Sequence, residues 1–151
     1  MSILPPDIPN GDYFVRVPDD KYVTEFIGAE GFWYRGRRPR VVLWFVIIEG
    51  NQKGARVPAY CNACSMDGRR SERVRQPKFT VGWGSNLVAF LGNLFPEKYT
   101  PNDLPTMIPE KDMLGRRILI ETRTNNKTHD GCERPAAFHN SVVRSVLGWA
   151  K

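Results

Sequence analysis

The segment GFWYRGRRPR, residues 31–40, places three consecutive aromatic residues directly before four arginines. Aromatic rings offer flat faces for stacking, and the planar arginine side chain both stacks and binds phosphates or carboxylates through two parallel hydrogen bonds. A β-hairpin extension whose aromatic side chains fold back onto the body of the fold is the alternative. The stacking candidates are Trp33 and Tyr34, and the anion-binding candidates are Arg35, Arg37, Arg38 and Arg40.

A second arginine-rich stretch, RRSERVRQPK, covers residues 69–78. Both stretches lie within residues 35–78, which hold 11 of the 22 Lys and Arg residues but only three of the 16 acidic residues. The formal net charge is +6, so this third of the chain supplies all of the excess positive charge. Such a concentration beside aromatic residues is typical of nucleic-acid binding, and a solvated basic surface is the alternative. The candidates in the second stretch are Arg69, Arg70, Arg73 and Arg75.

Three apolar stretches that read as strands carry further candidates. In the first stretch, residues 11–17, alternation places Phe14 and Arg16 on the face that points away from the core. In the third stretch, residues 55–61, Arg56 and Tyr60 share one face. Trp44 lies in the middle stretch. If these strand faces lie on the same side of the sheet, the three aromatic residues form a stacking platform. Its members would be Phe14, Trp44 and Tyr60, with Arg16 and Arg56 beside them. Plain core packing is the alternative for Trp44.

The elements that position these residues are short and mostly extended. Strand-like patterns predict a first strand at 11–17, which resumes through a bend to 27, and further strands at 40–50, 55–61, 115–124 and 136–148. Residues of the 40–50 strand are apolar on both faces, and one face carries Val41, Leu43, Phe45 and Ile47.

A single amphipathic helix is predicted at 85–95. It can be capped by Ser85 or Asn86 and must end before Pro96. Its apolar residues have the spacing of a helix that packs by one face, and they are Leu87, Phe90, Leu91 and Leu94.

The chain of 151 residues, 41% of them hydrophobic, is expected to form one domain over residues 1–151, with extended loops at 28–40 and 62–80. Five strands with one helix between the third and fourth predict a mostly β fold, the five-stranded OB-fold, which is a small Greek-key barrel. A mixed α+β sheet is also compatible with this order.

The chain resembles the OB-fold single-stranded DNA-binding proteins of bacteriophages and mobile elements. GDYFVRV matches their first strand of G-x-Y type. The apolar second strand ends in Glu49-Gly50, a few residues before Gly54, and the stretch Leu114-Gly115-Arg116 matches the start of their fourth strand. The similarity covers roughly residues 11–147.

This resemblance implies single-stranded DNA as the partner, bound without sequence preference and protected during DNA replication or recombination in the cytoplasm of a bacterial host cell. It leaves homo-oligomerisation open. Cellular single-strand binding proteins often end in a flexible acidic tail that recruits replication proteins. The end of this sequence, SVVRSVLGWAK, is apolar and basic, so recruitment by such a tail is not expected. RNA binding and a protein–protein interaction module that uses the same aromatic and arginine surface are the alternatives.

No cofactor and no enzymatic activity are expected. The chain has no nucleophile elbow, no phosphate-binding glycine loop and no paired-carboxylate motif. Zinc is the alternative to weigh, since Cys61-x2-Cys64 and His129-x2-Cys132 have suitable ligand types and spacing. The two pairs lie far apart in the chain, however, and Cys61 shares the core face of its strand. The N-terminal residues show no signal-peptide pattern, and the longest apolar run is too short to span a bilayer.

Overall fold

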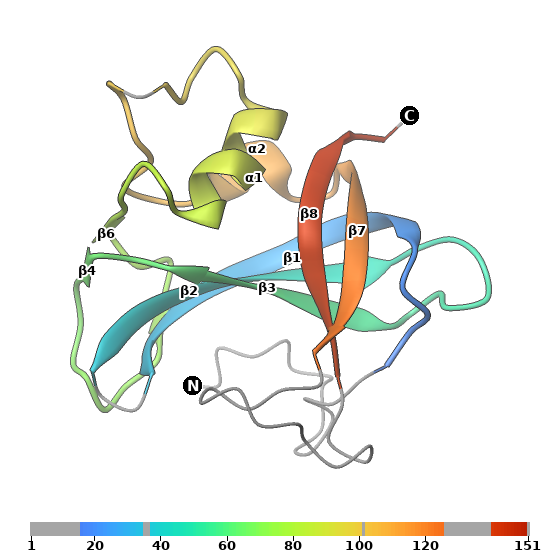
Figure 1. Cartoon of the computed structure of the whole chain (residues 1–151), viewed down its shortest axis with the longest axis horizontal. Helices are drawn as coiled ribbons and strands as arrows, with labels where there is room; N and C mark the ends of the chain where they lie inside the picture. Colours follow the sequence, from blue (N-terminus) through green and yellow to red (C-terminus); the bar gives the residue numbers. More distant parts are fainter. Residues whose placement is uncertain (1–15, 35–36, 101, 126–139, 151) are drawn as a thin grey trace.

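An antiparallel sheet of six strands forms the body of this mostly β protein (Figure 1). The computed structural model describes residues 16–34, 37–100, 102–125 and 140–150. The elements are β1 (Lys21–Tyr34), β2 (Arg38–Ile47), β3 (Arg56–Asn62), β4 (Ser65–Met66), β5 (Val74–Arg75), β6 (Phe79–Thr80), α1 (Asn86–Leu94), α2 (Glu110–Met113), β7 (Arg117–Asn125) and β8 (Asn140–Trp149). Five strands follow the order β3-β2-β1-β7-β8, β5 pairs with β1, and β4 pairs with β6 in a separate small sheet.

The strand β1 is long because it is shared among three partners. One of its edges pairs with β2, and the other pairs first with β7 and then, at Glu30 and Gly31, with β5. The register with β2 shifts between Phe26 and Gly28. Gly28 has a φ of +151°, a backbone conformation that residues other than glycine rarely adopt. This bulge lets the strand turn from one partner to the next.

The predicted first strand is wrong at Arg16 and Val17, whereas the predicted bend and the resumption of the strand up to residue 27 are confirmed. Val17 and Pro18 are not in a strand, and β1 begins only at Lys21. Pro18 has no backbone N–H for a ladder, and the chain bends at Asp19 and Asp20. The remainder of the predicted strand, residues 11–15, lies outside the described residues.

The predicted loop at 28–40 is wrong, and the alternative, a β-hairpin extension, is confirmed in the described part of this segment. β1 continues to Tyr34 and β2 begins at Arg38, so most of this segment forms a long β-hairpin. Aromatic residues favour pleated, paired backbone, and this preference outweighed the loop-like glycines and arginines. The segment 62–80 differs from a plain loop as well, since it contains the short strands β4, β5 and β6.

The predicted strands β2 and β3 and their inward faces are confirmed. Val41, Leu43, Phe45 and Ile47 lie fully buried in the core, and the turn at Gly50 and Gly54 joins the two strands. Residues on β3 that face the same core are Val57, Ala59 and Cys61. The predicted strands at 115–124 and 136–148 correspond to β7 and β8.

The predicted helix is confirmed as α1, with the Ser85 side chain accepting a hydrogen bond from the backbone N–H of Leu87. The helix lies between the two end strands of the sheet (Figure 1). Its Asn86 side chain donates to the Tyr60 carbonyl of β3 at 2.9 Å, and its Asn93 side chain donates to the Val146 carbonyl of β8 at 2.8 Å. The helix therefore satisfies carbonyl groups on strand edges that have no neighbouring strand in the sheet order.

Candidate functional site

Aromatic and basic side chains gather at the tip of the β1–β2 hairpin and on the outer face of β1, β2 and β3. The pairing register places Phe32 opposite Arg40, and Glu30 opposite Val42, which in turn lies opposite Tyr60. Because side chains alternate along a strand, these residues share the face that points away from the core. We refer to this face as the outer face.

Arginine side chains already lie against three of the aromatic rings. The guanidinium carbon of Arg70 is 4.8 Å from the centre of the Trp33 ring, and that of Arg73 is 4.8 Å from the centre of the Phe32 ring. Arg40 lies 5.9 Å from the centre of the Tyr60 ring. These distances are those of cation–π contacts, so the rings present faces on which a planar group stacks.

The prediction that Trp33 lies in a loop is wrong, since it belongs to β1. It is half-buried and packs against the hydrophobic core with one side while Arg70 lies over its ring. Packing back onto the core, the alternative for this residue, is therefore present in the structure, and stacking of Trp33 on bases stays a prediction. Phe32, which the sequence analysis did not single out, is half-buried on the outer face and contacts Arg73.

Trp44 is not available as a stacking platform. It is on the outer face of β2, as predicted, but only 4% of its surface is exposed. Core-like packing, the alternative stated for this residue, is what the structure has, although the residue lies across the sheet from the main core. Tyr60 and Arg56 share the outer face of β3 and are both half-buried, and burial lowers the pKa of Arg56.

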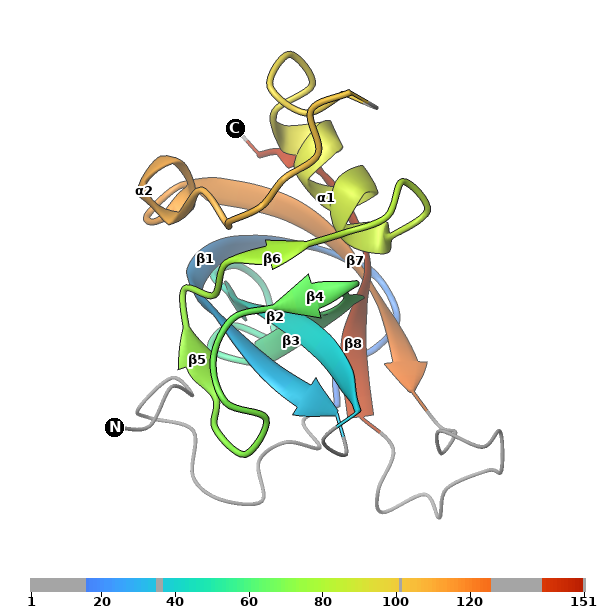
Figure 2. The same cartoon turned by 90° about the vertical axis from the view of Figure 1, so that its left-hand side faces the viewer.

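The segment 62–80 packs directly on β1 rather than standing free in solvent (Figure 2). Arg75 donates to the Ala29 carbonyl at 3.2 Å and lies 3.3 Å from a Glu110 carboxylate oxygen. A side chain at Gly28 would collide with Arg75, and one at Gly31 would collide with Met66 and Pro77. The segment 62–80 can therefore pack closely on β1 only because these two positions have no side chain.

Arg73 and Arg75, both predicted to bind nucleic acid, have acidic partners within the protein. Arg73 forms an ion pair with Glu30, whose side chain is completely buried, and Arg75 pairs with Glu110, which is 2% exposed. A buried carboxylate is strongly destabilising without a positive partner. The two ion pairs therefore hold Arg73 against β1 and Arg75 against α2. The arginines remain about two-fifths exposed.

Burial raises the pKa of Glu30 above its ordinary value. The positive charge of Arg73, the N–H of Trp44 and the charge of Arg75 oppose this rise, in that order. One carboxylate oxygen, Oε2, accepts no hydrogen bond of normal geometry from the residues that the structure describes. A carboxylate held by one arginine is therefore buried in the middle of the outer face.

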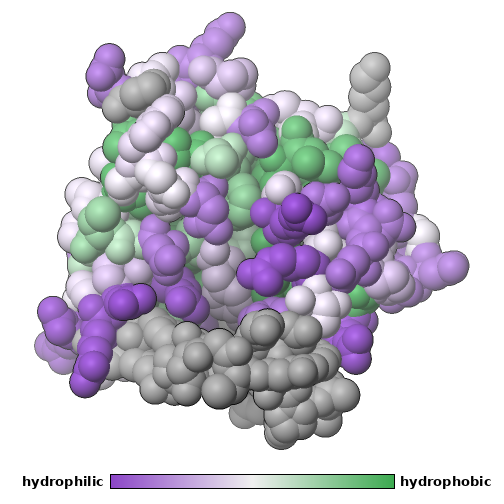
Figure 3. All heavy atoms as spheres, viewed as in Figure 1, coloured by the Kyte–Doolittle hydropathy of each residue, from purple (hydrophilic) through white to green (hydrophobic). Residues whose placement is uncertain are grey.

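Besides Arg73 and Arg75, four predicted arginines are exposed near the hairpin end: Arg37, Arg38, Arg69 and Arg70. Arg69 lies 3.8 Å from Glu72, an exposed pair that contributes little energy. On the face drawn in Figure 3, hydrophilic residues gather at the lower left, where Figure 1 places the tip of the β1–β2 hairpin and the loop that follows β4. The end of the hairpin is the basic end of the protein.

Of the remaining predicted residues, the structure describes the side chain of Arg16. Arg16 is exposed ahead of β1 and is not part of a strand. Phe14, Arg35 and the side chain of Tyr34 lie outside the described residues.

Sequence reasoning missed Trp83, which is 61% exposed and is the most exposed of the large hydrophobic side chains described. It lies between Gly82 and Gly84 in the loop that leads into α1. The Ser85 hydroxyl of this loop donates to the Asn62 carbonyl at the end of β3. An aromatic residue flanked by two glycines in a loop was the signal that could have found it.

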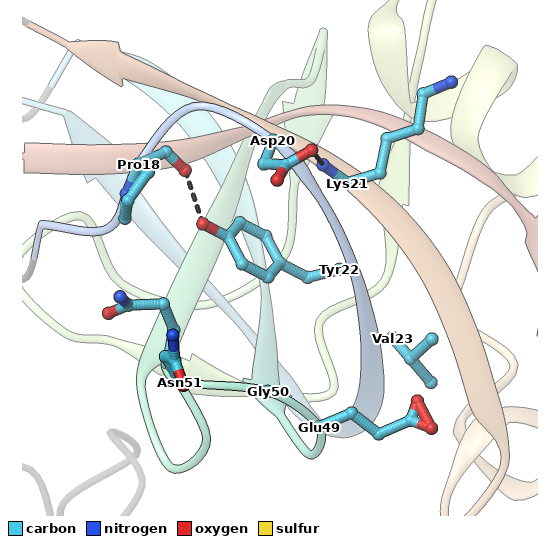
Figure 4. A pocket seen from close by; sticks show the side chains of 9 residues that line it. Pro18, Asp20, Lys21, Tyr22, Val23, Glu49, Gly50 and Asn51 are labelled. Carbon is cyan, nitrogen blue, oxygen red and sulfur yellow. Dashed lines mark hydrogen bonds between the residues drawn. The ribbon is translucent and has the colours of Figure 1, made fainter.

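A shallow cavity of about 420 Å³ lies at the opposite end of β1 from the hairpin tip (Figure 4). Tyr22 forms one side and donates its hydroxyl to the Pro18 carbonyl at 2.6 Å. Asp20 and Glu49 also line it, and Glu49 pairs with Arg117 at 3.6 Å. This cavity shares no lining residue with the basic end.

The two zinc candidates that the structure describes differ in environment. Cys61 is buried in the core, which raises the pKa of its thiol, and Cys64 is exposed. His129 and Cys132 lie outside the described residues. Within the described part of the chain, no three His, Cys, Asp or Glu side chains are grouped so that they could hold a metal ion.

No helix in the described part of the chain is long and apolar enough to cross a membrane. Comparison with known protein families, with curated proteins and with solved structures found no match in any of the three. Interpretation of the basic end therefore depends on its own geometry.

Proposed function

We propose that the protein binds single-stranded nucleic acid, with single-stranded DNA as the preferred ligand, along the outer face and the basic end. The observation that carries this proposal is the stacking of arginine on aromatic rings at Trp33, Phe32 and Tyr60, beside exposed arginines. Single strands need stacking surfaces for unpaired bases and positive charge for the backbone.

Strand order supports the accompanying proposal of an OB-fold. The order β3-β2-β1-β7-β8 has the central first strand between the second and fourth strands, as in that fold. Residues of β3 and β8 approach within 8 Å of one another between Cα atoms, which is compatible with a partly open barrel. Helix α1 follows the third long strand and packs across β3 and β8.

Under this proposal the binding residues, which include Phe32 in addition to predicted ones, sort into three groups. Arg37, Arg38, Arg69 and Arg70 are exposed and contact phosphates, while Trp33, Phe32 and Tyr60 stack on bases. Arg40 and Arg56, which are half-buried on the same outer face, contact the strand as it crosses the sheet. Trp44 supports the face from within.

A titration of intrinsic tryptophan fluorescence with an oligo-dT strand at two salt concentrations tests the proposal. Binding is expected to quench Trp33 and to weaken steeply with salt, because phosphate contacts release counterions. Competition with duplex DNA and RNA identifies the preferred ligand. Absence of both quenching and a gel shift at low salt would falsify the proposal.

A protein–protein interaction module is the second candidate, and exposed Trp83 favours it. Tryptophan and arginine dominate the energetics of protein interfaces, and a tryptophan that is 61% exposed has a large surface to bury. The same oligo-dT titration separates the two candidates, since a protein-binding surface gives no salt-dependent signal with the oligonucleotide.

A further inference from the structure

The arginine Arg73 has two partners within the protein and is also reachable from solvent. Its guanidinium group pairs with the Glu30 carboxylate and lies 4.8 Å from the centre of the Phe32 ring. The Arg73 side chain is 40% exposed, whereas that of Glu30 is 0% exposed. A phosphate that approaches the basic end can therefore reach Arg73, but it cannot reach Glu30.

The Glu30 carboxylate accepts fewer hydrogen bonds than that of Glu110, the other buried acid of this region. Glu110 accepts hydrogen bonds from the backbone N–H of Ala29 at 2.9 Å and from the Gln76 side chain, and it also pairs with Arg75. Glu30 accepts a hydrogen bond from Arg73 through Oε1 alone, and no described residue donates to its Oε2 with normal geometry. Loss of Arg73 would thus remove the main compensation for a buried negative charge.

We propose that Glu30 is an internal competitor for phosphate at Arg73, so that nucleic-acid binding moves this arginine from carboxylate to phosphate and leaves Glu30 to take up one proton. This inference rests on the proposed function and adds its regulation by pH. The carboxylate stands in for a phosphate while the site is empty. The proton comes from solvent, and no covalent bond changes.

The groups that face Glu30 determine the direction of the effect. Arg73 and Arg75 approach from the segment 62–80, and the Trp44 N–H approaches from β2. Burial already raises the pKa of Glu30 while Arg73 is in place, and departure of Arg73 removes the largest opposing influence. The bound form then has the higher pKa, so binding strengthens as pH falls.

The experiment measures oligo-dT affinity at constant salt between pH 5 and pH 8 for four proteins. They are the wild type, Glu30→Gln, Arg73→Gln and the control Glu72→Gln, which removes an exposed carboxylate from the same segment. Wild type and the Glu72→Gln control are expected to bind more tightly as pH falls, with at most about a tenfold change per pH unit for one proton. Near-ultraviolet circular dichroism checks that each variant is folded.

In both test variants, affinity is expected to lose the part of its pH dependence that comes from Glu30, but the two affinities differ in opposite directions from that of the wild type. Glu30→Gln binds tightly at every pH because no carboxylate competes for Arg73, whereas Arg73→Gln binds weakly at every pH. The two histidines of the chain are present in all four proteins, so comparison between variants removes any contribution from them.

Three outcomes are decisive. Opposite, pH-independent affinities of the two variants support the inference. Wild-type pH dependence in Glu30→Gln, or in Arg73→Gln if the former does not fold, overturns the inference while the proposed function stands. Failure of all four proteins to bind oligo-dT at low salt overturns both.

Discussion

Arg70 lies over the indole ring of Trp33, with its guanidinium carbon 4.8 Å from the ring centre. The pair joins the two arginine-rich stretches of the sequence, because Trp33 belongs to the β1–β2 hairpin and Arg70 to the segment between β4 and β5. An exposed arginine and a half-buried ring in contact make a surface on which a base can exchange with, or stack upon, the guanidinium plane. The basic end is therefore built from both stretches together.

Replacement of Arg70 by alanine is expected to weaken oligo-dT binding and to reduce the slope of log affinity against log salt by about 0.7, the value for one phosphate contact with a single strand. Folding stability should change little, because Arg70 is exposed. The matched control is Arg116→Ala, since Arg116 also stacks on a tryptophan, Trp149, at 3.6 Å but far from the hairpin tip in sequence. Equal losses of affinity in both variants would contradict a specific role for Arg70.

The double change Arg37→Ala and Arg38→Ala tests the turn of the hairpin. Both residues are exposed, with Arg37 in the turn directly before β2 and Arg38 at its first position. They are expected to contribute two phosphate contacts and about 1.4 to the salt slope. Filter binding at several salt concentrations measures this slope. An unchanged slope with normal folding would place the polynucleotide elsewhere on the protein.

The strands β2, β3, β7 and β8 and the helix α1 could be predicted because their residues repeat with the period of the element. The helix, for example, has buried residues at Leu87, Phe90, Leu91 and Leu94 and a Ser85 cap, each of which is a local signal. The lack of strand pairing at Arg16 and Val17 could not be predicted in the same way, since residue types alternate there as they do in a paired strand. Pairing partners far along the chain determine where the ladder begins.

The candidate site shows the same division between local and distant information. Arginine and aromatic residue types were sufficient to select the hairpin end, but they did not reveal which arginines are occupied by acids. Arg73 and Arg75 pair with Glu30 and Glu110, which lie 43 and 35 residues away in the sequence. Trp44 similarly has an apolar neighbourhood that looks the same for a platform and for a buried ring. Only the tertiary contacts separate these cases.

Two glycines test how the segment 62–80 is seated on β1. Gly31→Ala is expected to destabilise the protein by about 1–3 kcal/mol, because the new methyl group collides with Met66 and Pro77. Gly92→Ala is the control, since its methyl group meets nothing within 4 Å and lies in α1, where alanine should stabilise by about 0.5–1 kcal/mol. Urea unfolding gives both free energies. A neutral Gly31→Ala change would mean that the segment is held only loosely.

The contact between α1 and the sheet edge is tested by Asn93→Ala. This change leaves the Val146 carbonyl without its donor and should reduce the free energy of unfolding by about 1 kcal/mol. Asn86→Ala removes a similar bond to the Tyr60 carbonyl, but that bond is exposed to water, so a smaller loss is expected. Equal effects of the two changes would show that burial of the carbonyl does not decide the cost.

The stability of the protein should carry the signature of Glu30 in its pH dependence. Burial raises the pKa of Glu30 in the folded state above its ordinary value of 4.5, so the folded protein holds this proton to higher pH than the unfolded chain does. The resulting contribution to stability is fully present below about pH 4.5 and is lost as pH rises through the folded-state pKa.

Urea unfolding of wild type and Glu30→Gln between pH 4 and pH 7 isolates this contribution, because titration of all other groups is common to both proteins. The wild type should lose stability relative to Glu30→Gln as pH rises, whereas the exposed control Glu72→Gln should show no such trend. The opposite slope would mean that the charge of Arg73 outweighs burial and that Glu30 is a conventional stabilising ion-pair partner.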